Sequence, residues 1–183
     1  EIHCDLTKPG TEYIPFASVD DTCRDISVTC IAPTKTFNLA GLQTAAVYAE
    51  NSILHHRMWR QLNTDEVAEP NAFAIQATIA AFQYGEEWLD ELREYVEKNK
   101  QYVTEFLQEK IPLIHPVAGD ATYLMWLDCR KITESGRQFV KFIRKTSGLY
   151  VSGGNQYGRG CEGFLRMNVA TSKLVVEDGM QRL

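Results

Sequence analysis

Apolar and polar positions along the chain follow two patterns, one typical of buried strands and the other of amphipathic helices. The run Ile26–Ala32 is β-branched and apolar with a turn signal on either side, so it predicts a buried strand of a parallel sheet. Pro33 cannot donate to a β-ladder, and we expect the strand to stop there. The small, apolar run Gly41–Ala49 predicts a second buried strand.

Helical signals dominate the middle of the chain. Asn51 or Ser52 can cap a helix over Ile53–Gln61, and Pro70 suits the first turn of the next helix. From Glu86 to Gln108, apolar residues recur every three or four positions for about six turns, which predicts a long amphipathic helix. Such a long helix often links two domains.

The remaining residues alternate between strands and helices in a β-α-β-β-α order. This order is typical of a compact α/β domain, so the predicted fold class is α/β. The predicted elements are a strand over Ala121–Arg130, a helix over Gly136–Gly148 closed by a glycine C-cap, a short strand from Leu149 into a glycine-rich loop, a strand over Gly163–Ala170 and a helix over Leu174–Leu183.

Composition narrows the class of protein. The 183 residues are 44% hydrophobic and 23% charged, as in ordinary soluble globular proteins. A net charge of −5 without a basic stripe argues against a nucleic-acid partner, and the apolar runs are too short to cross a membrane. The five cysteines are scattered, without a Cys-x-x-Cys pair, which predicts reduced thiols in a cytoplasmic protein and no zinc site.

Lys35 is the first candidate for chemistry, because it follows the end of the first predicted strand. A lysine that acts as a nucleophile must be unprotonated part of the time, which requires desolvation or a cationic neighbour. Open α/β sheets bind ligands at the carboxyl ends of their strands, and Thr34, Asn38 and Gly41 suit a tight polar turn beside an anion. Position alone leaves a solvated surface lysine as the other interpretation.

Five segments, in order, resemble fold-type I pyridoxal-phosphate enzymes, most closely the cystathionine β-lyase-like C–S lyases among the class I/II aminotransferases. The resemblance implies pyridoxal 5′-phosphate as cofactor, an amino-acid substrate and a homodimer. It also implies that residues 1–85 are the last part of a large cofactor-binding domain with a parallel or mixed sheet, and that residues 86–183 are a small α/β domain. The segments are EIHCDL, APTKTFNLAGL, WLDELREYVEKN, ATYLMWLDCR and YGRGCEGFLRMNVA.

The resemblance also assigns cofactor-binding roles. Lys35 matches the lysine that holds the cofactor covalently, and Thr34 matches the hydroxyl residue that helps to hold its phosphate. His3 occupies a position near the ring hydroxyl, where many relatives have a tyrosine. Gln43 stands where many aminotransferases carry a phosphate-binding arginine, which fits the lyase branch better.

Substrate-binding roles fall in the second half of the chain. Arg166 matches the arginine that binds the substrate α-carboxylate, a task that suits a planar guanidinium. Asn168 follows on the same strand face and is expected to support it. Tyr157, in the glycine-rich loop, either contacts substrate or packs within the loop. Asp128 and Arg130 are expected to be a structural ion pair or solvated charges.

The expected function is a pyridoxal-phosphate-dependent lyase that cleaves cystathionine or a related cysteine S-conjugate to a thiol, pyruvate and ammonia. An aminotransferase of the same fold is the alternative, and a non-catalytic regulator that keeps the fold is a third possibility. In the family, the aspartate that pairs with the pyridine nitrogen directly precedes the position of Glu1. We therefore expect the chain to be part of a longer protein and, alone, to bind cofactor poorly and not to turn over.

Overall fold

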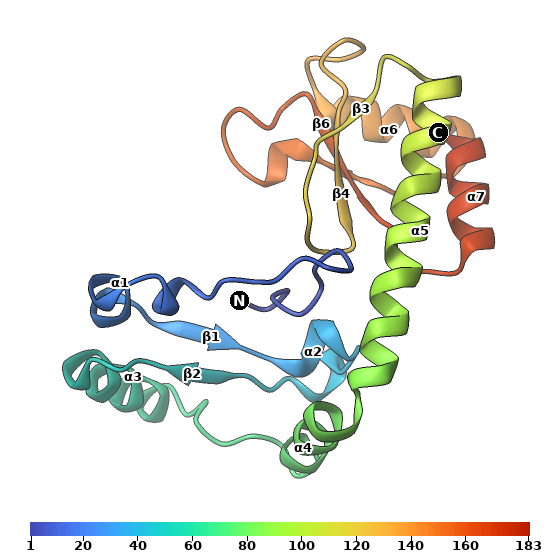
Figure 1. Cartoon of the computed structure of the whole chain (residues 1–183). Coiled ribbons are helices and arrows are strands. Elements are labelled where there is room, and N and C mark those ends of the chain that lie inside the picture. Colours follow the sequence, from blue (N-terminus) through green and yellow to red (C-terminus); the bar gives the residue numbers. More distant parts are fainter. The chain divides into compact units, whose positions relative to one another are not determined.

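The computed structural model describes residues 1–183, which form two compact units, Glu1–Arg93 and Glu94–Leu183. Figure 1 labels the main helices and strands. The division falls inside the long helix α5 (Glu86–Lys110). None of the helices combines the length and the hydrophobicity that crossing a lipid bilayer requires.

The first unit contains a two-stranded sheet with mostly helical connections. β1 (Thr29–Ile31) pairs antiparallel with β2 (Ala46–Tyr48), and Cys30 lies opposite Val47. Between the two strands the chain turns back through a one-turn helix and a 3-10 turn. The other elements of the unit are η1 (Phe16–Ser18), α1 (Asp21–Ile26), α2 (Pro33–Thr36), η2 (Ala40–Leu42), α3 (Ser52–Thr64), α4 (Ala74–Tyr84) and the start of α5.

The prediction of a buried parallel strand over Ile26–Ala32 is wrong. Asp20 caps the start of α1 by accepting a hydrogen bond from the backbone N–H of Cys23. This helix ends at Ile26, so the first residue of the predicted strand is helical. The strand that follows is short and antiparallel, and Cys30 and Ile31 are exposed because nothing in the unit covers them. The second predicted strand, Gly41–Ala49, is likewise reduced to β2.

The predicted helices agree with the structure more closely than the predicted strands do, because the sequence signals for helices are local. Asn51 caps α3 by accepting hydrogen bonds from the backbone N–H groups of Ile53 and Leu54, and α5 covers the predicted amphipathic stretch. α4 begins at Ala74 rather than at Pro70, because the Asn71 side chain turns the preceding backbone by accepting from the N–H of Phe73.

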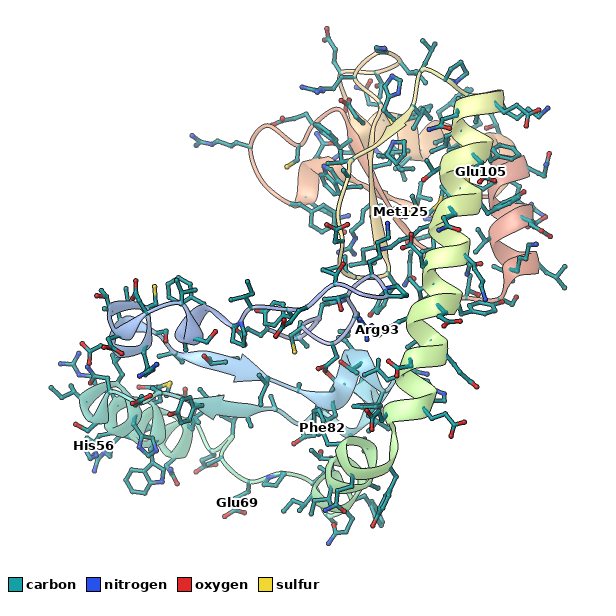
Figure 2. The ribbon with its side chains drawn as sticks, viewed as in Figure 1. His56, Glu69, Phe82, Arg93, Glu105 and Met125 are labelled. Atoms are coloured by element: carbon teal, nitrogen blue, oxygen red, sulfur yellow. The ribbon has the colours of Figure 1, made fainter.

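An aromatic contact fixes α2 against the start of α5. The Phe37 ring lies 5.4 Å from that of Phe82 on α4, edge-on, and 6.0 Å from that of Trp88 on α5. Figure 2 labels Phe82 among the side chains of this region. Gly85 separates α4 from α5, and a Cβ atom there would lie 2.5 Å from Phe37 Cε1. The missing side chain therefore allows the close approach of the Phe37 ring.

The second unit is built on a four-stranded antiparallel sheet in the order β3-β4-β6-β5. Trp126 of β4 pairs with Arg166 of β6, and Arg166 pairs with Ser152 of β5. The helix α6 ends at Gly148, whose φ of 75° confirms the predicted glycine C-cap. The elements are the rest of α5, β3 (His115–Pro116), β4 (Leu124–Asp128), α6 (Gly136–Ser147), β5 (Ser152–Gly153), η3 (Gly154–Gln156), β6 (Phe164–Asn168) and α7 (Lys173–Arg182).

Strand alternation gives this sheet one buried face and one partly open face. Asn99 of α5 is buried, and its Nδ2 donates to the carbonyls of Val169 and Thr171, which holds the helix against the end of β6. The opposite face carries Trp126 and Arg166, which are half-buried. The buried face and the helices contribute Met125, Leu127, Leu165, Met167, Val103, Leu107, Ile143 and Met180 to the core.

Candidate functional site

The short helix α2 presents Lys35 outward from the first unit. Pro33 occupies its first turn, and the N–H groups of Phe37 and Leu39 donate to the carbonyls of Pro33 and Thr34. Thr34 is buried, whereas the Lys35 side chain is exposed. Neither the Lys35 amine nor the Thr34 hydroxyl has a hydrogen-bond partner or a counter-ion within the chain. Both groups are therefore available to a ligand.

The expectation that a buried strand shields Lys35 from water is wrong for this chain. β1 is exposed, and the amine at its end is exposed with it. An apolar groove of about 570 Å³ is lined by the end of β1 and Pro33, by the segment that leads into β2, and by Ile79 and Phe82 of α4. Lys35 is not part of its wall, so the groove is separate from the amine.

The N-terminal segment, Glu1–Thr11, is hydrogen-bonded to both α2 and β1. The hydroxyl of Thr36, which is fully buried, donates to Asp5 Oδ2 at 2.8 Å. The amino group of Glu1 donates to the carbonyl of Cys30 at 2.9 Å. His3 lies between these two anchors and is half-buried. Three of the predicted site residues, His3, Thr34 and Lys35, thus belong to connected parts of one unit.

In the second unit, the open face of the sheet carries a guanidinium among aromatic rings. Arg166 Cζ lies 4.4 Å from the centre of the Tyr157 ring. Trp126 stands edge-on to Tyr157, with ring centres 5.5 Å apart, and stacks on Phe164 at 5.6 Å. Arg166 and Tyr157 are therefore brought together, as their assignment to one site requires.

Within its unit, Arg166 has no carboxylate partner, and the nearby Asp128 is already paired. Arg130 Nη2 lies 2.7 Å from Asp128 Oδ2, and its Nε donates to Oδ1 at 3.0 Å. These hydrogen bonds lower the pKa of Asp128 to about 2. Of the two alternatives expected from the sequence, an ion pair or solvated charges, the structure shows the ion pair, which leaves the charge of Arg166 uncompensated on a partly desolvated surface.

Hydrogen bonds with nearby backbone groups fix the Asn168 side chain and the loop that carries Tyr157. The Asn168 side chain is exposed on the face of Arg166, but its Oδ1 accepts from the N–H of Ala170 at 2.8 Å rather than contacting the guanidinium. The N–H of Tyr157 donates to the carbonyl of Gly154, which is buried where a Cβ would collide with the carbonyl of Cys161. The loop conformation that presents Tyr157 thus depends on a glycine.

Two aromatic residues of the open face, Trp126 and Phe164, were not among the site residues expected from the sequence. Trp126 alternates with the buried Met125 and Leu127, and it pairs with Arg166 across the sheet. The same alternation places Phe164 two positions before Arg166, on the same face. This pattern could have identified both rings as neighbours of the guanidinium once β4 and β6 were paired.

Comparisons with known proteins confirm the fold and the family that the sequence resemblance implies. The sequence profile for aminotransferases of class I and II matches residues 2–183. Cystathionine beta-lyase PatB from Bacillus subtilis is 39% identical over 183 residues, which is 100% of this chain and 47% of PatB.

Solved structures of similar proteins share the fold of this chain. A PLP-bound putative aminotransferase from Clostridium difficile has a TM-score of 0.95 at 29% identity, over 100% of this chain and 47% of that chain. A PLP-bound C-S lyase from Staphylococcus hominis has a TM-score of 0.86 at 32% identity, over 100% of this chain and 47% of that chain. The chain therefore spans about half the length of the relatives that it matches.

Proposed function

This chain belongs to the class I and II aminotransferase family, and we propose that the full-length protein is a pyridoxal-phosphate-dependent C–S β-lyase. Its substrate is cystathionine or a related cysteine S-conjugate, and its products are a thiol, pyruvate and ammonia. The observation that carries the proposal is the free amine of Lys35, presented on a one-turn helix at the end of β1 with no partner in the chain. The resemblance to PatB supports a lyase over other activities.

The residues present fit pyridoxal phosphate. This cofactor has an aldehyde, a phosphate and a ring hydroxyl, which require an amine, hydrogen-bond donors and a polar neighbour. Lys35 offers the amine, Thr34 offers a hydroxyl that no other group uses, and His3 offers an imidazole on the adjoining segment. When bound, the cofactor supplies an electron sink for the electrons released at the substrate Cα.

The roles of this chain's own residues follow from their chemistry. Arg166 binds the substrate α-carboxylate through its guanidinium, which is available because it has no carboxylate partner in its unit. Lys35 would act as the general base that removes the proton from the substrate Cα. Loss of the thiolate from Cβ and addition of one water molecule would account for the products, a thiol, pyruvate and ammonia.

Gln43 favours the lyase over the aminotransferase alternative. It occupies the position of the phosphate-binding arginine of many aminotransferases, and it is exposed and neutral, with a left-handed φ of 49°. An aminotransferase remains the second candidate, since a putative aminotransferase is among the similar solved structures. Both activities use Lys35 and Arg166, so an assay of the reaction is the decisive test between them.

The test is to incubate the full-length protein with cystathionine and no keto acid, and to assay thiol and pyruvate. Equimolar thiol and pyruvate support the lyase. Turnover that appears only after a keto acid is added supports the aminotransferase and contradicts the proposal. Cofactor absorbance without either reaction indicates a non-catalytic regulator. The matched control is Lys35→Arg, which keeps a positive charge but removes the amine, and it should abolish both reactions.

We also propose the finer assignments that the resemblance implies. Residues 1–85 belong to the large cofactor-binding domain and residues 86–183 to the small domain. The full-length protein is a homodimer that acts on an amino-acid substrate. A cytoplasmic location is supported by the five cysteines, none of which forms a disulfide.

A further inference from the structure

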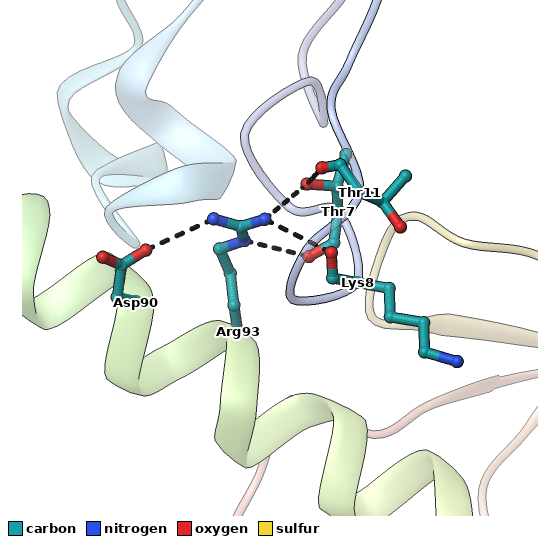
Figure 3. Close-up of polar contacts among 5 residues, drawn as sticks. All are labelled: Thr7, Lys8, Thr11, Asp90 and Arg93. Carbon is teal, nitrogen blue, oxygen red and sulfur yellow. Dashed lines mark hydrogen bonds and ion pairs between the residues drawn. The ribbon is translucent and has the colours of Figure 1, made fainter.

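Arg93, about two turns into α5, uses all three of its guanidinium nitrogens within the first unit. Its Nε donates to the carbonyl of Thr7 at 3.0 Å, and its Nη2 donates to the Thr7 hydroxyl at 2.8 Å and to the carbonyl of Lys8 at 3.3 Å. Nη1 contacts Asp90 Oδ1 at 3.2 Å. Figure 3 shows this arrangement around one turn of the N-terminal segment.

The turn that Arg93 binds is closed by a hydrogen bond between two of the turn's own residues. The Thr7 hydroxyl accepts from Arg93 and donates to the carbonyl of Thr11 at 2.9 Å. Thr7 is buried, and only 21% of the Arg93 side chain is exposed, so water screens these bonds less than it would at an open surface. The contact is therefore a fixed anchor rather than a mobile surface pair.

Arg93 is one of several anchors on the segment Glu1–Thr11. Two others are the bond from Thr36 of α2 to Asp5 and the bond from the amino group of Glu1 to the carbonyl of Cys30. His3 lies inside this segment, between the β1 anchor and the Asp5 anchor. Loss of the Arg93 contact would thus remove one of the bonds that hold the segment carrying His3 beside the helix that carries Lys35.

We propose that Arg93 is a positioning residue of the cofactor site, which fixes the segment carrying His3 beside the helix that carries Lys35. This inference rests on the proposed function, because His3 and Lys35 face the cofactor only if that function is correct. Arg93 touches neither substrate nor cofactor in this account. It acts by holding backbone carbonyls in place.

An arginine is required because the acceptors lie in several directions. The guanidinium is planar and presents five N–H groups in a rigid fork, whereas a lysine ammonium is a single compact centre. Lysine at this position would keep the charge and most of the stem, but it could not reach the Thr7 carbonyl, the Thr7 hydroxyl and Asp90 together. Arg93→Lys is therefore a selective test of the geometry.

The experiment compares full-length wild-type holoenzyme with Arg93→Lys, and with Arg60→Lys as the matched control. Arg60 is an exposed arginine of α3 in the same unit. Two readouts are independent of turnover: the rate at which cofactor is released, and the pH titration of its visible absorbance. Arg93→Lys should release cofactor about tenfold faster, since small displacements of a site's positioning groups have effects of this order or larger, and should shift the titration midpoint. Arg60→Lys should match wild type.

A second variant keeps the test decisive if Arg93→Lys folds poorly. Thr7→Val removes one acceptor and keeps the shape of the side chain, so it should give a smaller increase in the release rate. The double variant should be no worse than Arg93→Lys alone, because the two residues share one network. Altered thermal unfolding with unchanged release rate and titration would reduce Arg93 to a structural role and overturn the inference. A wild-type protein that never acquires the cofactor band would instead refute the proposed function.

Discussion

Arg166 Cζ lies 4.4 Å from the centre of the Tyr157 ring, which gives the guanidinium an aromatic partner but no negative charge. The electron-rich face of the ring offsets part of the cost of holding a cation on a partly desolvated surface. The ring cannot neutralise that cation, so the position still favours an incoming carboxylate. This relationship leads to two predictions about substrate binding.

The Tyr157 ring should matter more than its hydroxyl. We expect Tyr157→Leu to raise KM for the amino-acid substrate about fivefold, corresponding to about 1 kcal/mol of lost cation–π stabilisation of Arg166. Tyr157→Phe keeps the ring and should stay close to wild type. If Phe and Leu raise KM equally in steady-state kinetics, the hydroxyl contacts substrate directly and the ring plays no special part.

Replacing Arg166 should weaken recognition of the carboxylate specifically. Arg166→Lys loses the bidentate geometry, and we expect KM to rise about a hundredfold, or about 3 kcal/mol. The matched control is Arg130→Lys. Arg130 lies over the ring of Phe164, which is in the same strand as Arg166, but Arg130 is paired with Asp128. Its KM should be unchanged. Equal effects of the two substitutions would mean that general charge, rather than one carboxylate site, governs binding.

The ion pair of Asp128 and Arg130 should make a small pH-dependent contribution to stability. The folded-state pKa of Asp128, about 2, lies below the ordinary value of 3.8, so the contribution is present above about pH 4 and is lost as the pH falls toward 2. Arg130 is largely exposed, which limits the effect to about 1 kcal/mol or less.

Carboxyl-carbon NMR can measure this titration directly. Arg130→Gln should return the pKa of Asp128 toward its ordinary value and should flatten the stability profile below pH 4. An Asp128 titration that is the same in the variant and in wild type would show that the hydrogen bonds from Arg130 do not cause the low pKa.

Gly85 should be intolerant of any side chain. Gly85→Ala places a Cβ against Phe37 Cε1 and against the carbonyl of Ala81, and we expect it to lower the free energy of unfolding by about 2 kcal/mol. The matched control is Gly119→Ala, since no atom lies within 4 Å of a Cβ at Gly119. Denaturant unfolding of both variants measures the difference. A loss no larger than that of the control would mean that Phe37 moves aside without cost.

Local signals explain which elements the sequence could predict. Apolar spacing identifies α5, the Asn51 side chain marks the start of α3, and Gly148 marks the end of α6, because each signal acts within a few residues. The pairing and burial of β1 could not be predicted in this way. Both depend on what covers the strand, and an apolar run looks the same whether it is covered or exposed.

In the candidate site, too, features set by neighbouring residues could be predicted from the sequence, and contacts between distant residues could not. The position of Lys35 follows from its neighbours in the sequence, and so does the shared strand of Arg166 and Asn168. The contacts that we propose to support the site join distant residues: Thr36 and Asp5 are 31 positions apart, and Arg93 and Thr7 are 86 apart. No spacing rule connects such pairs, so Arg93 emerged only from the structure.

The claim that Lys35 holds the cofactor can be tested most directly by chemical trapping. Full-length protein loaded with pyridoxal phosphate is reduced with borohydride, digested and analysed by peptide mass spectrometry. The account predicts one modified lysine, Lys35, whose peptide gains the mass of the reduced cofactor. Modification of a different lysine, or none at all in protein that shows the cofactor absorbance, would contradict it.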